Sequence, residues 1–203
     1  MFDLLSYLES LPSEFPGILR VSPDIANLMA CRHFAQFCST VRSLVDPNVH
    51  CPFCRRERLR RKRRYIAAYG RWGLLENEFP HNGTEKMLLI VSEDHVIDPS
   101  SMSRGDWANV GWLFEHAREK CEIPDGILFL RYGDARYNAS SIVHLHFNVI
   151  RPTPGKGFRP PAAKTEEKHA EDYARMRDYW KTVHERGGSN WLFSHEGIAE
   201  TQP

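Results

Sequence analysis

The sequence predicts an α+β fold, in which an antiparallel sheet of about five strands carries one packed central helix. Three observations indicate this fold. Residues 143–149 alternate between apolar and polar side chains, which is the period of a half-buried strand. Residues 86–92 form a compact apolar run of strand length, and residues 106–121 carry an apolar stripe at helical spacing. Strands on both sides of a single helix favour an antiparallel sheet with that helix across it.

Residues 1–48 predict a helical extension that precedes this domain. A short amphipathic helix at the N-terminus should end near Pro12. A second helix should begin with Ser22 as its N-cap and Pro23 in its first position, and stop before Pro47. Cys31, His33 and Cys38 lie on this second helix and are interpreted as core or surface residues.

Residues 49–152 contain the sheet. Tyr65, Ile66 and Tyr69 fit the end of a helix that stops before Gly70. The elements that follow alternate between extended and helical patterns. In order, we expect a strand at 72–79, a turn at 80–83 and a strand at 86–92. A helix at 106–121, a strand at 126–132, a loop at 133–140 and a closing strand at 142–150 should follow.

Residues 153–203 form a linker followed by a C-terminal helix. The proline- and glycine-rich stretch 153–161 is typical of a linker or a surface arm. A charged helix should begin at Thr165 and stop at Gly187. We expect Trp191 to dock onto the protein and residues 197–203 to fray.

Composition bounds the class of protein. The 203 residues are 41% hydrophobic, which suffices for one domain with a core plus extensions. The formal net charge is +1, so overall charge does not argue for nucleic acid. There is no apolar run of the ~20 residues that span a bilayer, and the acidic N-terminus is unlike a secretory signal. With five cysteines, an odd number, the chain fits a reducing interior, so we expect a soluble cytoplasmic protein without a membrane partner.

A basic run extends from Arg55 to Arg64, and eight of its ten residues are arginine or lysine. Two interpretations stay open for it. The run could be a solvated helix face, or it could bind polynucleotide or polyphosphate. The absence of interleaved aromatic residues weakens the case for stacking on single strands.

The closing strand and several upstream motifs resemble one known family. The motifs, in chain order, are Cys51-Pro-Phe-Cys54, Asn77-Glu-Phe-Pro80-His-Asn82, the strand from Lys86 with His95 after it, Ser140-Ser141, and His144-Leu-His146-Phe-Asn148-Val-Ile. Together they resemble the histidine-triad (HIT) superfamily over roughly residues 51–152. Each fragment is weak alone, but the order of all of them is that of the family.

The resemblance implies a structural zinc ion held by Cys51, Cys54, His95 and His144. A Cys-x-x-Cys pair with two imidazoles is a common closed tetrahedral set for zinc. With four protein ligands the ion would have no open position, so it would stabilise the fold and fix the start of the histidine strand.

The resemblance also implies that His146, the middle histidine of the motif, attacks a nucleoside 5′-phosphoryl group and forms a covalent nucleotidyl intermediate. Its other ring nitrogen should then donate to a fixed acceptor, such as a backbone carbonyl. The implied nucleotide-binding residues are Asn77, Phe79 and Pro80 for the nucleoside and Ser140 and Ser141 for the phosphate.

Asn148 replaces the third histidine of the family pattern. An amide donates a hydrogen bond to a phosphoryl oxygen but supplies no proton at pH 7. Related transferases and phosphorylases place an amide at this point, so we expect nucleotidyl transfer or phosphorolysis. Two alternatives stay open: a hydrolase of dinucleoside polyphosphates, phosphoramidates or nucleic-acid adenylates, and a weakly catalytic nucleotide- or nucleic-acid-binding module. A homodimer is also kept open.

Overall fold

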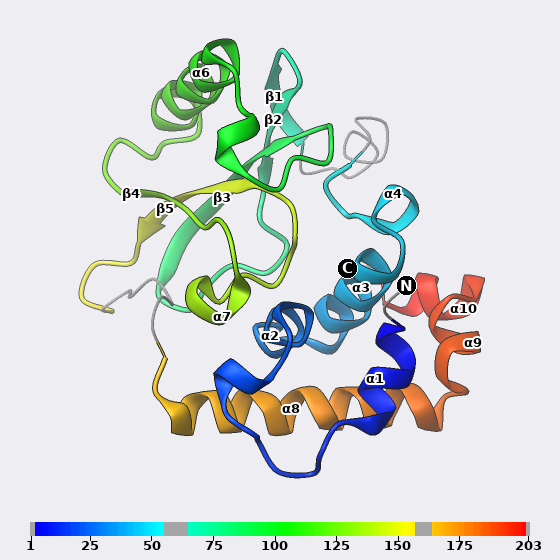
Figure 1. The fold of residues 1–203 in the computed structure, drawn as a ribbon. Coiled ribbons are helices and arrows are strands. Elements are labelled where there is room, and N and C mark those ends of the chain that lie inside the picture. The colour runs from blue at the N-terminus through cyan, green and yellow to red at the C-terminus, as the bar shows by residue number, and fades with distance from the viewer. Residues whose placement is uncertain (1–2, 55–64, 157–163, 202–203) are drawn as a thin grey trace. The chain divides into compact units, whose positions relative to one another are not determined.

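The computed structural model describes residues 3–54, 65–156 and 164–201 (Figure 1). The chain forms two compact units. Unit 1 comprises Met1–Cys51, Asp134–Val143 and Pro161–Pro203, and unit 2 comprises Pro52–Gly133 and His144–Pro160. The N- and C-terminal extensions, which the sequence separates, therefore share one unit. The basic run from Arg55 to Arg64, for which a solvated face and polynucleotide binding both stay open, lies outside the described residues.

Unit 1 is helical. Its elements are α1 (Leu4–Ser10), η1 (Ile18–Arg20), α2 (Pro23–Met29), α3 (Phe34–Val45), α4 (Pro47–His50), α7 (Ala135–Asn138), α8 (Glu166–Glu185), α9 (Gly188–Leu192) and α10 (His195–Glu200). The N-caps follow the sequence prediction, because the Ser22 hydroxyl accepts from Ile25 N and the Thr165 hydroxyl accepts from Lys168 N. In the described ranges, no helix is both long and apolar enough to span a membrane.

The core of unit 1 lies along the long helix α8 (Figure 1). Tyr173, Met176, Trp180 and Val183 supply its buried face, and Trp191 docks into the same core as predicted. The residues of α1, α2 and α3 that complete this core are Leu4, Leu8, Ile25, Leu28, Met29, Phe37, Cys38 and Val41.

The sequence predicts one helix from Ser22 to before Pro47, but the structure has two helices there, α2 and α3. His33, between α2 and α3, has extended backbone angles of φ −129° and ψ 146°. The side chain of Gln36 accepts from Arg32 N (2.9 Å) and so satisfies a backbone donor near the start of α3. Cys31 and His33 therefore lie in the link between helices, and only Cys38 is helical.

Unit 2 is built on the antiparallel sheet. Its elements are β1 (Tyr65–Tyr69), β2 (Trp72–Glu76), β3 (Thr84–Ser92), η2 (Pro99–Ser101), α6 (Arg104–Lys120), β4 (Ile127–Leu130) and β5 (His146–Pro152). In the part of the chain that the structure describes, the strands form one sheet in the order β1-β2-β3-β5-β4, with every neighbouring pair antiparallel. The predicted α+β class, the sheet of about five strands and the packed helix are confirmed.

The sheet has two different faces. On one face, Leu88 and Ile90 of β3 and Phe147 and Val149 of β5 share a core with the buried residues of α6. His146 and Asn148 alternate with these β5 residues and so lie on the opposite face. Because direct cross-strand partners share a face, Val91 and Leu89 of β3 flank His146 and Asn148 there.

Two predicted elements in unit 2 need correction. Residues 65–69 are strand β1 rather than the end of a helix, because a two-residue turn at Gly70 and Arg71 returns the chain antiparallel into β2. Gly70 has a φ of +58°, which suits the first position of such a hairpin turn. The closing strand begins at His146, so His144 precedes it in irregular backbone.

Asp106 joins the start of α6 to the beginning of β2. Its carboxylate accepts from both Nε and Nη2 of Arg71 and from Nε1 of Trp72, each at 2.8 Å. It also accepts from the backbone N and the hydroxyl of Ser103, completing a capping box. The hydrogen bonds from Arg71 lead the interactions that hold the pKa of Asp106 far below its ordinary value.

We expect Asp106→Asn to lower the free energy of unfolding by about 1–3 kcal/mol, because an amide nitrogen would face the donors that surround this buried side chain. A depressed folded-state pKa stabilises the protein above the ordinary carboxyl pKa and loses that effect as pH falls. The difference in free energy of unfolding between wild type and variant should therefore be largest at pH 7 and shrink below about pH 4. Denaturant unfolding at both pH values measures it.

The matched control for this prediction is Asp94→Asn. Asp94 also contacts Arg71 (3.1 Å), but its side chain is 66% exposed, so its removal should change stability by less than about 0.5 kcal/mol. Equal losses of stability in the two variants, or a loss from Asp106→Asn that does not change with pH, would contradict the stabilising role of the Asp106 carboxylate.

Candidate metal centre and active site

The structure brings together all four predicted metal ligands. Among the described residues, one ligand atom from each of Cys51, Cys54, His95 and His144 lies within 4.8 Å of the other three. Cys54 Sγ is 3.3 Å from His95 Nδ1 and 3.6 Å from His144 Nδ1. The cysteines come from the turn that precedes the basic run, His95 follows β3, and His144 precedes β5.

Hydrogen bonds around the cluster fix the orientation of the histidines. His144 Nε2 lies 3.0 Å from the carbonyl of Ser92, which can only accept, so Nε2 carries the proton and Nδ1 keeps a lone pair. Leu145 N donates to the carbonyl of Val96 (2.7 Å), which joins the segments that carry the two histidines. Metal-binding histidines commonly donate their other ring nitrogen to such a carbonyl.

The donor set and its dimensions fit a tetrahedral zinc ion. Zn–S bonds of ~2.3 Å and Zn–N bonds of ~2.0–2.1 Å give a sulfur-to-nitrogen separation of about 3.6 Å across a tetrahedron. The two measured separations, 3.3 and 3.6 Å, are close to that value. Burial, together with the neighbouring His95 and His146, lowers the pKa of His144 to about 3, so its imidazole is neutral and able to bind a metal at pH 7.

His146 carries a defined tautomer on the face of the sheet opposite α6. Its Nδ1 lies 2.8 Å from the carbonyl of His144, so Nδ1 is the protonated nitrogen and Nε2 bears the lone pair. Burial lowers the pKa of His146 to about 4, and the charge of Arg131 contributes to the lowering. The side chain is therefore a neutral imidazole at pH 7, as nucleophilic attack requires.

The Asn148 amide is a buried donor beside His146. Among the described residues, its Nδ2 atom is shielded from solvent and makes no hydrogen bond, and the residue is only 2% exposed. An unsatisfied buried donor costs about 1–3 kcal/mol, so such groups call for an explanation. An acceptor on a bound ligand would provide one.

Phe53 is a site residue that the sequence reasoning missed. It lies between the two cysteines, and its ring centroid is 5.5 Å from that of His144 and 5.6 Å from that of His146. The aromatic residue thus connects the cysteine turn to the candidate nucleophile. Its position inside the Cys-x-x-Cys motif was the signal that could have indicated it.

The predicted nucleoside-binding residues lie in the loop after β2. Asn77 N donates to the carbonyl of Met87 (3.0 Å), and its side-chain oxygen accepts from Phe79 N (2.8 Å). Met87 is four residues along β3 from Val91, the partner of His146, which corresponds to about 13 Å of strand. The binding roles of Asn77, Phe79 and Pro80 stay predictions.

The predicted phosphate-binding serines belong to unit 1. Ser140 O accepts from Asn27 Nδ2 (2.6 Å), and the Ser140 hydroxyl donates to the carbonyl of Ile142 (3.0 Å). The Ser141 hydroxyl accepts from Gln36 Nε2 (2.9 Å), which leaves its own proton available to a ligand. The roles of Ser140 and Ser141 stay predictions.

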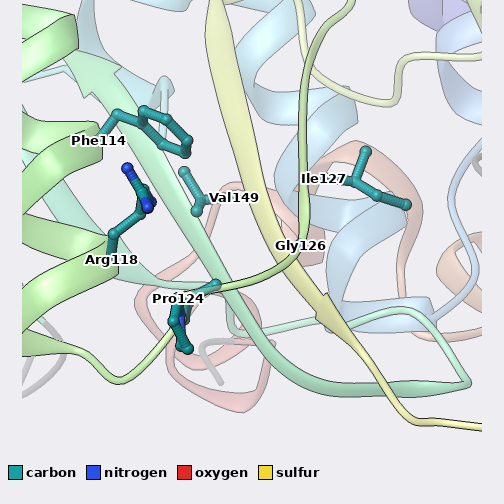
Figure 2. Close-up of a pocket in the computed structure, with 7 residues that line it drawn as sticks. Phe114, Arg118, Pro124, Gly126, Ile127 and Val149 are labelled. Carbon is teal, nitrogen blue, oxygen red and sulfur yellow. The ribbon is translucent and has the colours of Figure 1, made fainter.

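One pocket of unit 2 lies apart from these residues (Figure 2). It has a volume of ≈ 160 Å³ and is lined by Phe114, Arg118, Ile123, Pro124, Gly126, Ile127 and Val149. Val149 places it on the α6 face of the sheet, opposite His146. At this size it is smaller than the ~300–1,000 Å³ that drug-sized ligands occupy, and none of the predicted site residues line it.

Gly126, directly before β4, allows the chain to approach β5 closely. A side chain there would place its Cβ 2.2 Å from the carbonyl of Ile150, so only glycine allows the chain to approach β5 before β4 begins. The pairing of β4 with β5 that follows positions Phe129 opposite Asn148.

Comparison with known proteins gives matches among solved structures alone. No family model matches the chain, and no curated protein matches it. A zinc-bound histidine triad family protein from Mycobacterium smegmatis is 11% identical, covering 59% of this chain and 86% of its own, with a TM-score of 0.37.

Two further matches are similar in extent. A hypothetical histidine triad nucleotide-binding protein from Sulfolobus tokodaii is 15% identical over 62% of this chain and 88% of its own, with a TM-score of 0.36. Diadenosine triphosphate hydrolase from Plasmodium falciparum, in complex with Cyclomarin A, is 12% identical over 62% and 79%, with a TM-score of 0.38.

Proposed function

We propose that this chain is a histidine-triad nucleotidyltransferase or phosphorylase, in which His146 attacks a nucleoside 5′-phosphoryl group. The observation that carries the proposal is the hydrogen bond from His146 Nδ1 to the carbonyl of His144 (2.8 Å). It fixes the ring and leaves the lone pair of Nε2 available, which is the arrangement that covalent catalysis by imidazole needs.

The proposed reaction has two steps. Nε2 forms a bond to phosphorus while the bond from phosphorus to the leaving oxygen breaks, and the leaving group departs with that electron pair. An oxygen of the acceptor then attacks phosphorus, the N–P bond breaks, and the imidazole returns to its neutral form. Asn148 supports both steps by donating its unsatisfied Nδ2–H to a phosphoryl oxygen.

Cys51, Cys54, His95 and His144 would hold a structural zinc ion in this enzyme. With all four positions occupied by protein, the ion stabilises the fold and takes no part in bond making. His144 would bind through Nδ1, and its backbone carbonyl would orient His146. Metal binding and the position of the nucleophile are therefore linked through a single residue.

The Phe53 ring contacts the His146 ring, with centroids 5.6 Å apart, so we expect this ring to move aside or to stack on the nucleotide when substrate binds. A nucleobase offers the planar face that such stacking uses. The residue is 7% exposed in the structure.

Transfer is favoured over hydrolysis because Asn148 cannot accept a proton from water. We expect the nucleotidyl adduct to persist in water and to be discharged by phosphate or a phosphorylated acceptor. General-base catalysis is typically worth ~100–10,000-fold, so Asn148→His should shorten the adduct lifetime in buffer by roughly 10-fold or more. Rapid-quench measurement of adduct decay, with and without acceptors, tests this.

Asn148→Gln is the matched control, because it keeps the amide and supplies no base. Its adduct should persist as long as that of the wild type. Fast hydrolysis in the wild type that no acceptor outruns would contradict the transferase proposal and identify the protein as a hydrolase.

A further inference from the structure

Arg131 directly follows β4, the strand that pairs with the strand of the candidate nucleophile. The pairing of β4 with β5 matches Phe129 to Asn148 and Leu130 to Phe147. Arg131 directly follows the end of β4 at Leu130, and His146 is the first residue of β5, so the same register continued by one residue brings Arg131 to the level of His146. Phe129 is the partner of Asn148 and shares its face of the sheet, and the contact of the Arg131 guanidinium with the Phe129 ring places the guanidinium on that face too.

The guanidinium is held over this face. Its central carbon lies 5.0 Å from the centroid of the Phe129 ring, which is itself opposite Asn148. One of its terminal nitrogens, Nη2, is shielded from solvent. Thus a permanent cation, a buried amide donor and a nucleophilic nitrogen share one part of the sheet.

We propose that Arg131 binds the phosphoryl oxygens of the substrate while His146 attacks phosphorus. This inference rests on the proposed function and names the group that recognises the charge of the substrate. A guanidinium presents several donors in a fixed fork that matches phosphate geometry, and it stays protonated throughout the reaction. The oxygens that gain negative charge would be held by Arg131 on one side and by the Asn148 amide on the other.

The proposal defines the class of ligand. Groups that carry a 5′-phosphate should bind better than the corresponding nucleoside, and the difference should depend on Arg131. An arginine that served only to pack on Phe129 would contribute equally to both ligands. The comparison of each nucleotide with its own nucleoside therefore separates recognition from packing.

The test uses the full-length protein and four pairs of probes, the 5′-monophosphates of adenosine, guanosine, cytidine and uridine, each compared with its nucleoside by calorimetry. For the pair that binds most tightly, Arg131→Met should weaken monophosphate binding by about 10- to 100-fold, which is typical of hydrogen bonds to charged groups. Nucleoside binding should change by less than about twofold. Arg131→Lys should retain part of the preference for the monophosphate.

Arg118→Met is the matched control, because Arg118 is exposed on α6 and lines the pocket on the other face of the sheet (Figure 2). It should leave both affinities unchanged, and thermal unfolding checks that every variant is folded. Equal monophosphate affinity in wild type and Arg131→Met, or equal losses for both probes, would overturn the role of Arg131 alone. If the wild type binds none of the monophosphates, the proposed function fails with it.

Discussion

His146→Ala should lower turnover of a nucleotide substrate by roughly 1,000-fold or more, because removing the nucleophile of a covalent mechanism removes the reaction path itself. Nδ1 of His146 is fixed by the carbonyl of His144, so Nε2 is the ring nitrogen left to attack, and alanine provides no nucleophile in its place. Nucleotide binding should fall far less, because Arg131 and Asn148 remain. A large loss in kcat with a small change in affinity is the expected signature.

His116→Ala is the matched control for this substitution. His116 is a partly buried histidine of α6, on the other side of the sheet from His146, and should be dispensable for turnover. Zinc content and thermal unfolding should be checked in both variants, because the His144 carbonyl loses its donor when His146 is removed. Turnover within tenfold of the wild type in a folded His146→Ala protein would contradict covalent catalysis by this residue.

Cys54→Ser should reduce bound zinc from about one ion per chain to nearly none and lower the free energy of unfolding by on the order of 5 kcal/mol. Cys54 Sγ contacts the ligand nitrogens of both histidines, so its loss removes one of the four ligands at the centre of the cluster. The expected cost is below the ~10–16 kcal/mol of zinc-finger peptides, because unit 2 keeps a hydrophobic core of its own.

Cys121→Ser provides the control for the loss of a buried thiol. Both Cys54 and Cys121 belong to unit 2 and are 8% exposed, but Cys121 lies in the core near α6 and away from the cluster. The control should retain its zinc and lose much less stability. Metal analysis that finds zinc in Cys54→Ser, or none in the wild type, would contradict the metal centre.

The sequence was most informative where chemistry requires particular side chains at fixed spacing. Cys51, Cys54, His95 and His144 were predicted together, and the structure places them within one cluster. The alternation from Val143 to Val149 also predicted the core residues of this segment. Leu145, Phe147 and Val149 enter the core, whereas Val143 is only partly buried. Both signals come from patterns that the local backbone geometry enforces.

The elements that were predicted wrongly depend on distant partners. The short run that begins at Tyr65 is compatible with helix or strand, and its pairing with β2 decides between them. The C-terminal residues were expected to fray, yet Thr201 is 2% exposed because its hydroxyl accepts from Nη2 of Arg42 at 2.7 Å. A hydrogen bond between residues 159 positions apart cannot be predicted from the local sequence pattern.

Arg131 could not be recognised from the sequence for the same reason. It is one arginine directly after an apolar strand, and its proposed role appears only when β4 pairs with β5 and the guanidinium lies over Phe129, the partner of Asn148. Phe53 lies inside the Cys-x-x-Cys motif, but its contact with the His146 ring depends on the fold. Such residues are defined by the neighbours that the fold supplies, so spacing alone does not identify them.

The measurement that tests the central proposal most directly is the mass of the intact protein after brief incubation with nucleotide substrates and a quench in base, where a phosphoramidate survives. We predict a wild-type species heavier by one nucleotidyl group, absent from His146→Ala and present in His116→Ala. The mass added identifies the nucleotide, and loss of the adduct on addition of phosphate identifies transfer. No adduct with any nucleotide, or the same adduct in His146→Ala, would contradict covalent nucleotidyl transfer through His146.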